Sequence, residues 1–318
     1  YKEYLKQYLS YGLSFPSARA KAVYRYMKLN NIIYSNNGKF INDNHKNIDT
    51  DILEDILSST NNSTNNILSF SNNILGIEYL KALKRLKSNI VPYTINRQTN
   101  SYTDQKLTGE ISSAAAIREY IKHPESQSIN CTLPLESLNI INREFQKGKG
   151  PVFMDSFENI IFAILRKISV DSIKDYPSIT EGLENRIKKA SNVSGNLEEL
   201  ISNICTKRYT KTRIQRAILN ILLDITNDEF QHFNTYGGPQ YIRVLGFNKN
   251  GQDLLAKIKK TAGLPIIVNT SNFLKCDNVL LRKMLQLEAL TTDIYVLGYK
   301  NPHYRFSGQE YTENVVIM

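Results

Sequence analysis

Apolar residues recur every three to four positions along most of the chain, which predicts a largely helical protein. The predicted helices span residues 1–11, 16–28, 71–87, 135–146, 156–168, 180–190, 196–205, 211–225, 251–260 and 279–290, and a further helix starts near Ser112. The clearest is 211–225, whose apolar stripe consists of Ile214, Ala217, Ile218, Ile221, Leu222 and Ile225. Thr212 and Gln215 have the spacing of a capping box at its start.

Short apolar runs predict the strands. One is expected at 90–95, and the runs at 241–247 and 265–268 flank the helix 251–260, as in a βαβ unit. The order helix, strand, loop, helix in the first part of the chain is α/β in character.

The same patterns suggest how the chain is divided. We expect an α/β domain over 1–125 and a mostly helical domain over 126–318. Residues 30–73 contain 13 asparagines, which indicates an Asn-rich surface insertion over 30–70 with a helical island near 48–57.

The positive charge is concentrated in one segment. The chain carries 40 basic and 30 acidic residues, a net charge of +10. No acidic residue lies between Glu199 and Asp224, and this segment contains the cations Lys207, Arg208, Lys211, Arg213 and Arg216. Tyr209 adds a stacking face, and two arginines three apart on a helix repel each other unless an anion lies between them. The segment therefore favours a polyanion partner such as RNA, the alternative being a solvated basic surface.

Other features restrict the class of protein. No uninterrupted run of roughly 18 apolar residues exists, and the start does not look like a signal peptide. The three cysteines lack the paired spacing of a metal site. We therefore expect a cytoplasmic protein without a membrane partner.

Three segments are candidates for nucleotide binding. Asn72 lies at a helix start, where its amide can bond a base or ribose, although it can also be an ordinary cap. Arg97 follows the predicted strand and can clamp a phosphate, or be a plain surface arginine. Ser112 and Ser113 open a helix that carries Arg118, which suits a triphosphate, although capping alone also explains the serines.

Five ordered segments resemble the bacterial tRNA(Met) cytidine acetate ligase family. They are Gly12–Pro16, Asn72–Ile77, Thr180–Arg186, Lys207–Thr210 and Arg213–Arg216, and the resemblance runs from about residue 11 to about residue 300. It implies an α/β fold: the remainder of a nucleotidyltransferase-like (HUP/Rossmann-like) domain, followed by a mostly helical C-terminal domain with a small βαβ element.

The resemblance also implies a function. Members of the family use ATP, with Mg²⁺ expected beside it, to activate acetate as acetyl-adenylate and to acetylate the wobble cytidine of elongator tRNA(Met). The implied ATP contacts are Asn72, Arg97, Ser112, Ser113 and Arg118, and the implied tRNA contacts are Arg186, Lys207, Arg208, Lys211, Arg213 and Arg216.

The sequence departs from the family pattern in two places. Ala114 stands where the serine motif often has threonine. The family's N-terminal His-x-Gly-His loop has no counterpart, because His45, His123, His232 and His303 all lie in other settings. No catalytic residue is therefore assigned. Two alternatives stay open, a catalytically incomplete RNA-binding fragment and an adenylyltransferase acting on a small metabolite, and the sequence does not give the oligomeric state.

Overall fold

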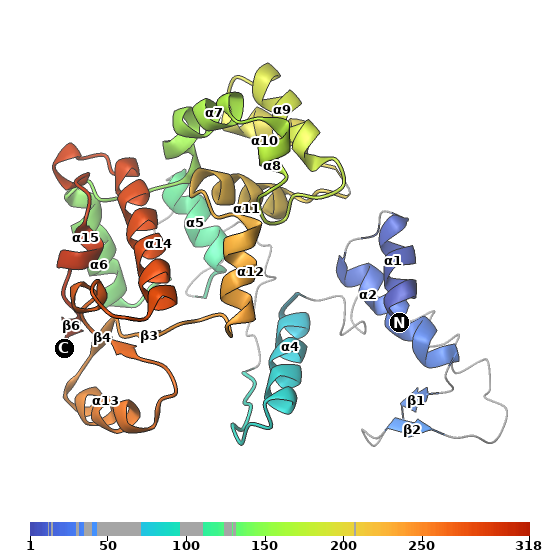
Figure 1. The fold of residues 1–318 in the computed structure, drawn as a ribbon, viewed down its shortest axis with the longest axis horizontal. Coiled ribbons are helices and arrows are strands. Elements are labelled where there is room, and N and C mark those ends of the chain that lie inside the picture. Colours follow the sequence, from blue (N-terminus) through green and yellow to red (C-terminus); the bar gives the residue numbers. More distant parts are fainter. Residues whose placement is uncertain are drawn as a thin grey trace. The chain divides into compact units, whose positions relative to one another are not determined.

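The computed structural model describes residues 1–11, 13, 15–29, 32–34, 40–42, 71–95, 111–123, 129, 132–206 and 208–318 (Figure 1). The chain forms two compact units. The first contains Tyr1–Asn96 with Cys205–Thr210, and the second contains Arg97–Ile204 with Lys211–Met318. The predicted functional division after residue 125 stays a prediction.

The first unit contains three helices and one hairpin in its described part. They are α1 (Lys2–Ser10), α2 (Phe15–Leu29), β1 (Ile32–Tyr34), β2 (Phe40–Asn42) and α4 (Ser71–Arg85). The two strands are antiparallel, with Ile33 opposite Ile41. The helices confirm the predictions for 1–11, 16–28 and 71–87, whereas the island at 48–57 lies outside the described residues.

Arginines of α2 connect the helices of this unit. Arg25 donates to the Gln7 side chain at 3.0 Å and lies 4.8 Å from the Tyr4 ring, which fastens α2 to α1. Arg19 is buried and pairs with Glu78 of α4 at 2.9 Å. Hydrogen bonds from Lys81 and then from Arg19 lower the pKa of Glu78, so its carboxylate stays charged at neutral pH.

The prediction of a strand at 90–95 is wrong. These residues form no strand, and each of them is exposed, with Ile95 at 97%. A strand exists only through hydrogen bonds to a neighbour, and no described residue pairs with this run. The β-branched residues of this run indicated a high propensity for β-strand, but they could not show that no neighbouring strand pairs with it in the described part of the chain.

The second unit is mostly helical. Its helices are α5 (Ala114–Lys122), α6 (Leu135–Gln146), α7 (Glu158–Lys167), α8 (Val170–Ile173), α9 (Leu183–Val193), α10 (Leu197–Ile204), α11 (Lys211–Leu222), α12 (Asn227–Thr235), α13 (Lys249–Thr261), α14 (Val279–Tyr295) and α15 (Gln309–Thr312). Short 3₁₀ turns lie at Met154–Phe157, Ser271–Phe273, Val296–Gly298 and Pro302–Tyr304. Figure 1 shows α7 to α10 gathered at one end of this unit, with α11 beside them.

Local sequence explains where several of these helices begin. Ser113, Ser169, Thr226, Asn248 and Asn278 each accept a hydrogen bond from a backbone N–H in the first turn. The capping box predicted from Thr212 is wrong, because α11 already begins at Lys211 and Thr212 lies inside its first turn.

Branched aliphatic side chains fill the core of the helical bundle. The largest fully buried ones include Ile161, Leu165, Ile173, Leu183, Ile187, Leu197, Leu200, Ile204, Ile214 and Ile218. They come from α7 to α11 at helical spacing, so each helix turns one apolar face inward. Burying such side chains contributes roughly 1.5–3 kcal/mol each.

Two basic side chains cap each other's helices. Lys188 of α9 donates to the carbonyl oxygens of Leu165, Arg166 and Ile168 at 3.0, 2.7 and 2.7 Å, at the end of α7. In return Arg166 of α7 donates to the carbonyls of Ser191 and Ser194 at the end of α9. The last carbonyls of a helix lack intrahelical partners and carry the negative end of its dipole, so a cation there stabilises both helices.

The predicted βαβ unit is confirmed. β3 (Ile242–Arg243) and β5 (Ile266–Ile267) are parallel neighbours joined through α13. The run 241–247 is not one strand, however: it splits into β3 and β4 (Gly246–Phe247), and β4 pairs in parallel with β6 (Val316–Ile317). Tyr241 and Ile267 pack against Leu281 and Leu285 of α14 as a separate small core.

Replacement of Lys188 by methionine removes three hydrogen bonds from the end of α7 and keeps most of the side chain's length. We expect the free energy of unfolding to fall by about 1–3 kcal/mol in urea denaturation. Lys189→Met is the matched control, because Lys189 is exposed and makes no bond to the described residues. Equal stability of the two variants would contradict the capping role.

The Tyr176 hydroxyl predicts a pH dependence. It donates to Asp224 at 2.6 Å, and burial followed by this bond raises its pKa to about 12. The pKa of Tyr176 in the folded protein exceeds its unfolded value of about 10. The contribution of this hydrogen bond to the free energy of unfolding is therefore complete below pH 10 and is lost as pH rises toward 12. Tyr176→Phe should therefore lose less stability than the unchanged protein between those pH values. Denaturation curves that shift in parallel for both proteins would refute this assignment.

Candidate functional site

The start of α5 carries the serine part of the proposed nucleotide site. Ser113 is buried and its hydroxyl accepts from the Ala116 N–H at 3.0 Å, so it is the helix cap. Ser112 is half-buried and Arg118 is exposed on the same helix. No acidic residue occupies the first turn. The capping explanation is therefore confirmed for Ser113, while the positive end of α5 stays compatible with an anion.

The other two nucleotide candidates are less defined. Asn72 lies in the first turn of α4, a helix of the first unit, and its side chain lies outside the described residues. Arg97 lies outside them altogether. Both stay predictions.

The basic segment between α10 and α11 has a defined turn at its centre. The Thr206 hydroxyl accepts from the backbone N–H groups of Arg208 and Tyr209. Arg208 is exposed, with its guanidinium 5.8 Å from the buried Tyr209 ring. Tyr209 therefore does not present the open stacking face that its sequence position suggested. Lys207 lies outside the described residues.

Two of the predicted RNA-contacting arginines brace the protein itself. Arg213 donates to the Ser178 carbonyl at 3.0 Å and to the Thr180 hydroxyl at 2.7 Å. Arg186 donates to the carbonyls of Asn203 and Ile204 at the end of α10. The repulsion expected between Arg213 and Arg216 is thus relieved inside the protein, because Arg213 points to acceptors of the loop before α9.

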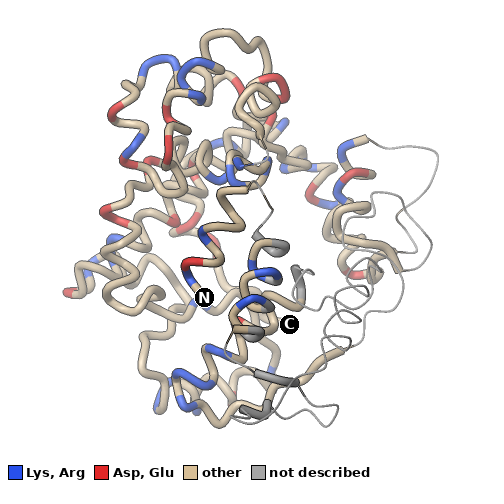
Figure 2. Tube along the Cα trace, turned by 90° about the vertical axis from the view of Figure 1, so that its right-hand side faces the viewer, with Lys and Arg blue, Asp and Glu red and all other residues tan. Residues whose placement is uncertain are grey.

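Lys211 and Arg216 differ from these arginines. Arg216 is exposed on the side of α11 opposite the buried stripe that includes Ile214 and Ile218, and Lys211 is exposed as the first residue of the helix. Neither makes a hydrogen bond or an ion pair with any residue that the structure describes. Figure 2 shows basic and acidic residues interspersed over much of the described trace, whereas α11 contains no acid. These two cations retain the capacity to bind an anion.

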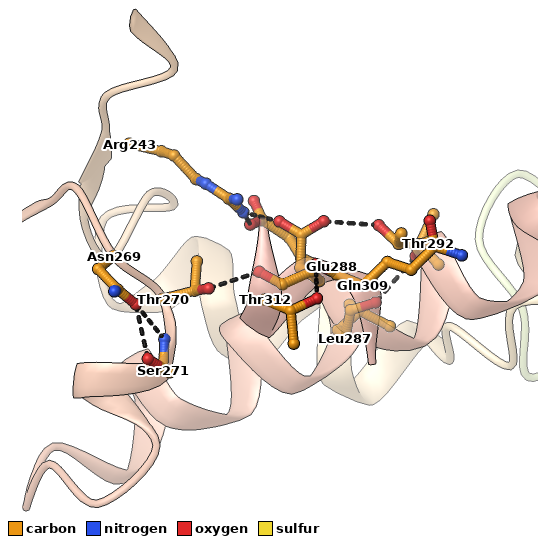
Figure 3. Close-up of polar contacts among 11 residues, drawn as sticks. Arg243, Asn269, Thr270, Ser271, Leu287, Glu288, Thr292, Gln309 and Thr312 are labelled. Atoms are coloured by element: carbon orange, nitrogen blue, oxygen red, sulfur yellow. Dashed lines mark hydrogen bonds and ion pairs between the residues drawn. The ribbon is translucent and has the colours of Figure 1, made fainter. Parts of the chain in front are cut away.

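A polar cluster lies at the carboxyl ends of β3 and β5 (Figure 3). Arg243 bonds Glu288 at 3.1 Å and also contacts the Glu310 carboxylate. Thr292 donates to that carboxylate at 2.8 Å, and Thr270 donates to the Glu310 carbonyl at 2.5 Å. With two carboxylates on one guanidinium, the cluster cannot attract a phosphate. It instead holds β3, α14 and α15 together.

Other site types find little support in the described part of the chain. It contains no group of three or more His, Cys, Asp or Glu residues placed to hold a metal ion. His123, His232 and His303 are all exposed. None of the helices searched is both long and apolar enough to cross a membrane.

Comparison with known proteins gives the class and then the family. Residues 1–310 match the family model described as HIGH Nucleotidyl Transferase, which makes the chain a nucleotidyl transferase of that class. It is 43% identical to the tRNA(Met) cytidine acetate ligase of Acetivibrio thermocellus, over 100% of this chain and 70% of that protein. Identity to the ligase of Halothermothrix orenii is 38%, over 99% of this chain and 70% of that protein. The chain belongs to the tRNA(Met) cytidine acetate ligase family, a family of enzymes.

Solved structures agree with this assignment. Thermotoga maritima TmcAL in its apo form is 27% identical and superposes with a TM-score of 0.82, over 100% of this chain and 70% of that protein. The form of the same protein bound with alpha-thio ATP gives a TM-score of 0.79, over 100% of this chain and 69% of that protein. The fold class and the resemblance inferred from sequence are therefore confirmed.

Proposed function

We propose that the protein is an ATP-dependent ligase that acetylates the wobble cytidine of elongator tRNA(Met) in the cytoplasm. The observation that carries the proposal is the 43% identity to a tRNA(Met) cytidine acetate ligase along the whole chain. The relative bound with alpha-thio ATP supports ATP as the nucleotide.

The proposed chemistry has two steps. A carboxylate oxygen of acetate attacks the α-phosphorus of ATP, and the bond to pyrophosphate breaks to leave acetyl-adenylate. The exocyclic amine of the cytidine then attacks the acetyl carbonyl carbon, AMP leaves, and the amine loses a proton. We expect Mg²⁺ to accompany the phosphates, since this ion is usually held through substrate phosphate oxygens.

On the ATP side, the start of α5 fits a phosphate group. Its first turn lacks acids, and a helix N-terminus offers free N–H groups and a positive dipole. We assign Ser112, Ser113 and the exposed Arg118 to the phosphates, since a hydroxyl that accepts a cap bond can still donate its own hydrogen. Asn72 and Arg97 complete the proposed contacts.

On the RNA side, Lys211 and Arg216 are the better candidates for direct contact, because both are exposed and neither bonds to a residue that the structure describes. We add Lys207 and Arg208, which precede them in the same acid-free stretch of sequence. Arg186 and Arg213 contribute mainly by holding α10 and the loop before α9.

The reaction is tested with the protein, ATP, acetate and elongator tRNA(Met). We expect acetylated cytidine to form in the absence of acetyl-CoA, as measured by nucleoside mass spectrometry. Pyrophosphate should be released in an equal amount. Arg97→Ala should reduce product by at least tenfold through loss of a charge-assisted phosphate contact. Product that requires acetyl-CoA would overturn the function, and undiminished product from Arg97→Ala would overturn that contact.

The RNA contacts are tested with Lys211→Gln/Arg216→Gln. We expect weaker tRNA binding and a salt slope smaller by about 1.4–1.8, because two phosphate contacts are lost. The control is Lys259→Gln/Lys260→Gln, which removes two exposed lysines from the end of α13. An unchanged affinity and slope for the α11 variant would favour a small-metabolite adenylyltransferase.

A further inference from the structure

The second unit has another region rich in cations, which no single stretch of sequence reveals. Residues 145–154 contain no acid and include Lys147 and Lys149. Residues 294–309 also contain no acid and include Lys300 and Arg305. Each segment alone has too few cations to stand out.

The fold brings these two segments into direct contact at the ends of α6 and α14. The Asn301 N–H donates to the Gly148 carbonyl at 3.2 Å, and the Asn301 side chain donates to the Lys147 carbonyl at 3.0 Å. Gly148 has φ +75°, and a Cβ there would lie 2.7 Å from Asn301 Cβ. A Cβ on Gly298 would lie 2.6 Å from a Val152 methyl. The two segments are therefore tightly packed and form one surface.

The cations of this surface outnumber its acids. Its basic members are Arg143, Lys147, Lys149, Lys300 and Arg305. Glu144 pairs with Arg143, Lys147 and Lys149 at 2.7, 3.3 and 3.8 Å. Asp293 accepts from the Gly308 N–H at 2.7 Å, and Glu313 is the third nearby carboxylate. Five cations against these three carboxylates leave a surplus of two, which Lys300 and Arg305 supply. Lys300 is exposed and makes no bond to the described residues.

Aromatic rings lie among these cations. Lys149 sits 4.8 Å from the centre of the Tyr304 ring, and Phe306 is 57% exposed. The buried Gln309 side chain donates to the carbonyls of Tyr304 and Phe306 at 2.6 and 2.9 Å, which fixes the turn that carries both rings. An exposed phenylalanine on a fixed turn is ready to stack with a planar group at little entropic cost.

We propose that this surface, defined as Lys147, Lys149, Lys300, Arg305, Tyr304 and Phe306, binds an unpaired stretch of RNA. The inference rests on the proposed function, because it supplies a second contact for the same tRNA beyond α11. Arg305 donates through Nε to the Tyr299 carbonyl at 2.8 Å, which orients its exposed guanidinium. Lys300 and Arg305 neutralise backbone phosphates, and an unpaired base stacks on Phe306. Cations alone would suit duplex RNA equally well, whereas an exposed ring among cations is typical of single-strand binding.

The first test measures binding of elongator tRNA(Met) and of a short oligouridine by Lys300→Gln/Arg305→Gln. We expect affinity to fall at least about fivefold and the salt slope to fall by about 1.4, since two single-strand phosphate contacts are lost. The charge-preserving pair Lys300→Arg/Arg305→Lys should bind like the unchanged protein. The control is again Lys259→Gln/Lys260→Gln.

The second test separates stacking from charge. Phe306→Ala should weaken oligouridine binding about fivefold or more without changing the salt slope, and Phe306→Tyr should restore it. Oligouridine should compete with tRNA better than a duplex RNA of equal length. A cooperative thermal unfolding transition is required of each variant, to show that it is folded.

The outcomes distinguish this inference from the proposed function. If tRNA binds the unchanged protein and Lys300→Gln/Arg305→Gln with equal affinity and equal salt dependence, the proposed RNA-binding surface is refuted while the proposed function stands. If oligouridine binds through Lys300 and Arg305 but tRNA(Met) is not acetylated, the surface stands and the function fails. If phosphatidylserine vesicles bind through these residues and RNA does not, the RNA assignment is overturned.

Discussion

The second unit depends on cations that satisfy the carboxyl ends of neighbouring helices. Lys188 and Arg166 cap α7 and α9 reciprocally, and Arg186 extends the scheme to α10. Helices packed this closely place their last carbonyls near the core, where an unsatisfied acceptor costs roughly 1–3 kcal/mol. A long basic side chain reaches such carbonyls while its aliphatic stem covers apolar surface. The arrangement of α7 to α10 is thus fixed by directional bonds as well as by the branched core.

This constraint divides the positive charge of the protein into two populations. Some basic residues are held by carbonyls or carboxylates and serve the fold, as Lys188 and Arg213 do. Others, such as Lys211, Arg216 and Lys300, extend from the surface without an internal partner among the described residues. The second population, together with an exposed arginine such as Arg305 that bonds a single carbonyl, can release counterions from an RNA backbone at little structural cost. The net charge of +10 therefore overstates the surface available to a polyanion.

Neighbouring carboxylates decide which arginines can recognise a phosphate. Arg243 lies at the carboxyl ends of two parallel strands, a position where α/β folds often bind ligands. Glu288 and Glu310 nevertheless occupy its guanidinium, so the position braces the small βαβ element (Figure 3). Lys300 has a less suggestive place in the fold, but no described carboxylate pairs with it. In this protein, the local balance of charge indicates which cations can bind phosphate better than their position in the fold does.

The sequence by itself determined most of the helices, the family and the βαβ element, because apolar periodicity, caps and ordered motifs are all local signals, but it missed α8, α12 and α15. It also located the exposed Lys211 and Arg216, since an acid-free segment can be read directly. The tertiary structure alone decided that the 90–95 run forms no strand, that 241–247 splits between two sheets, and that Arg186 and Arg213 turn inward. It alone joined residues 147–149 to 300–306. The physical reason is the same in each case: a strand partner, a carbonyl acceptor or a neighbouring charge lies far away in sequence and is supplied only by folding.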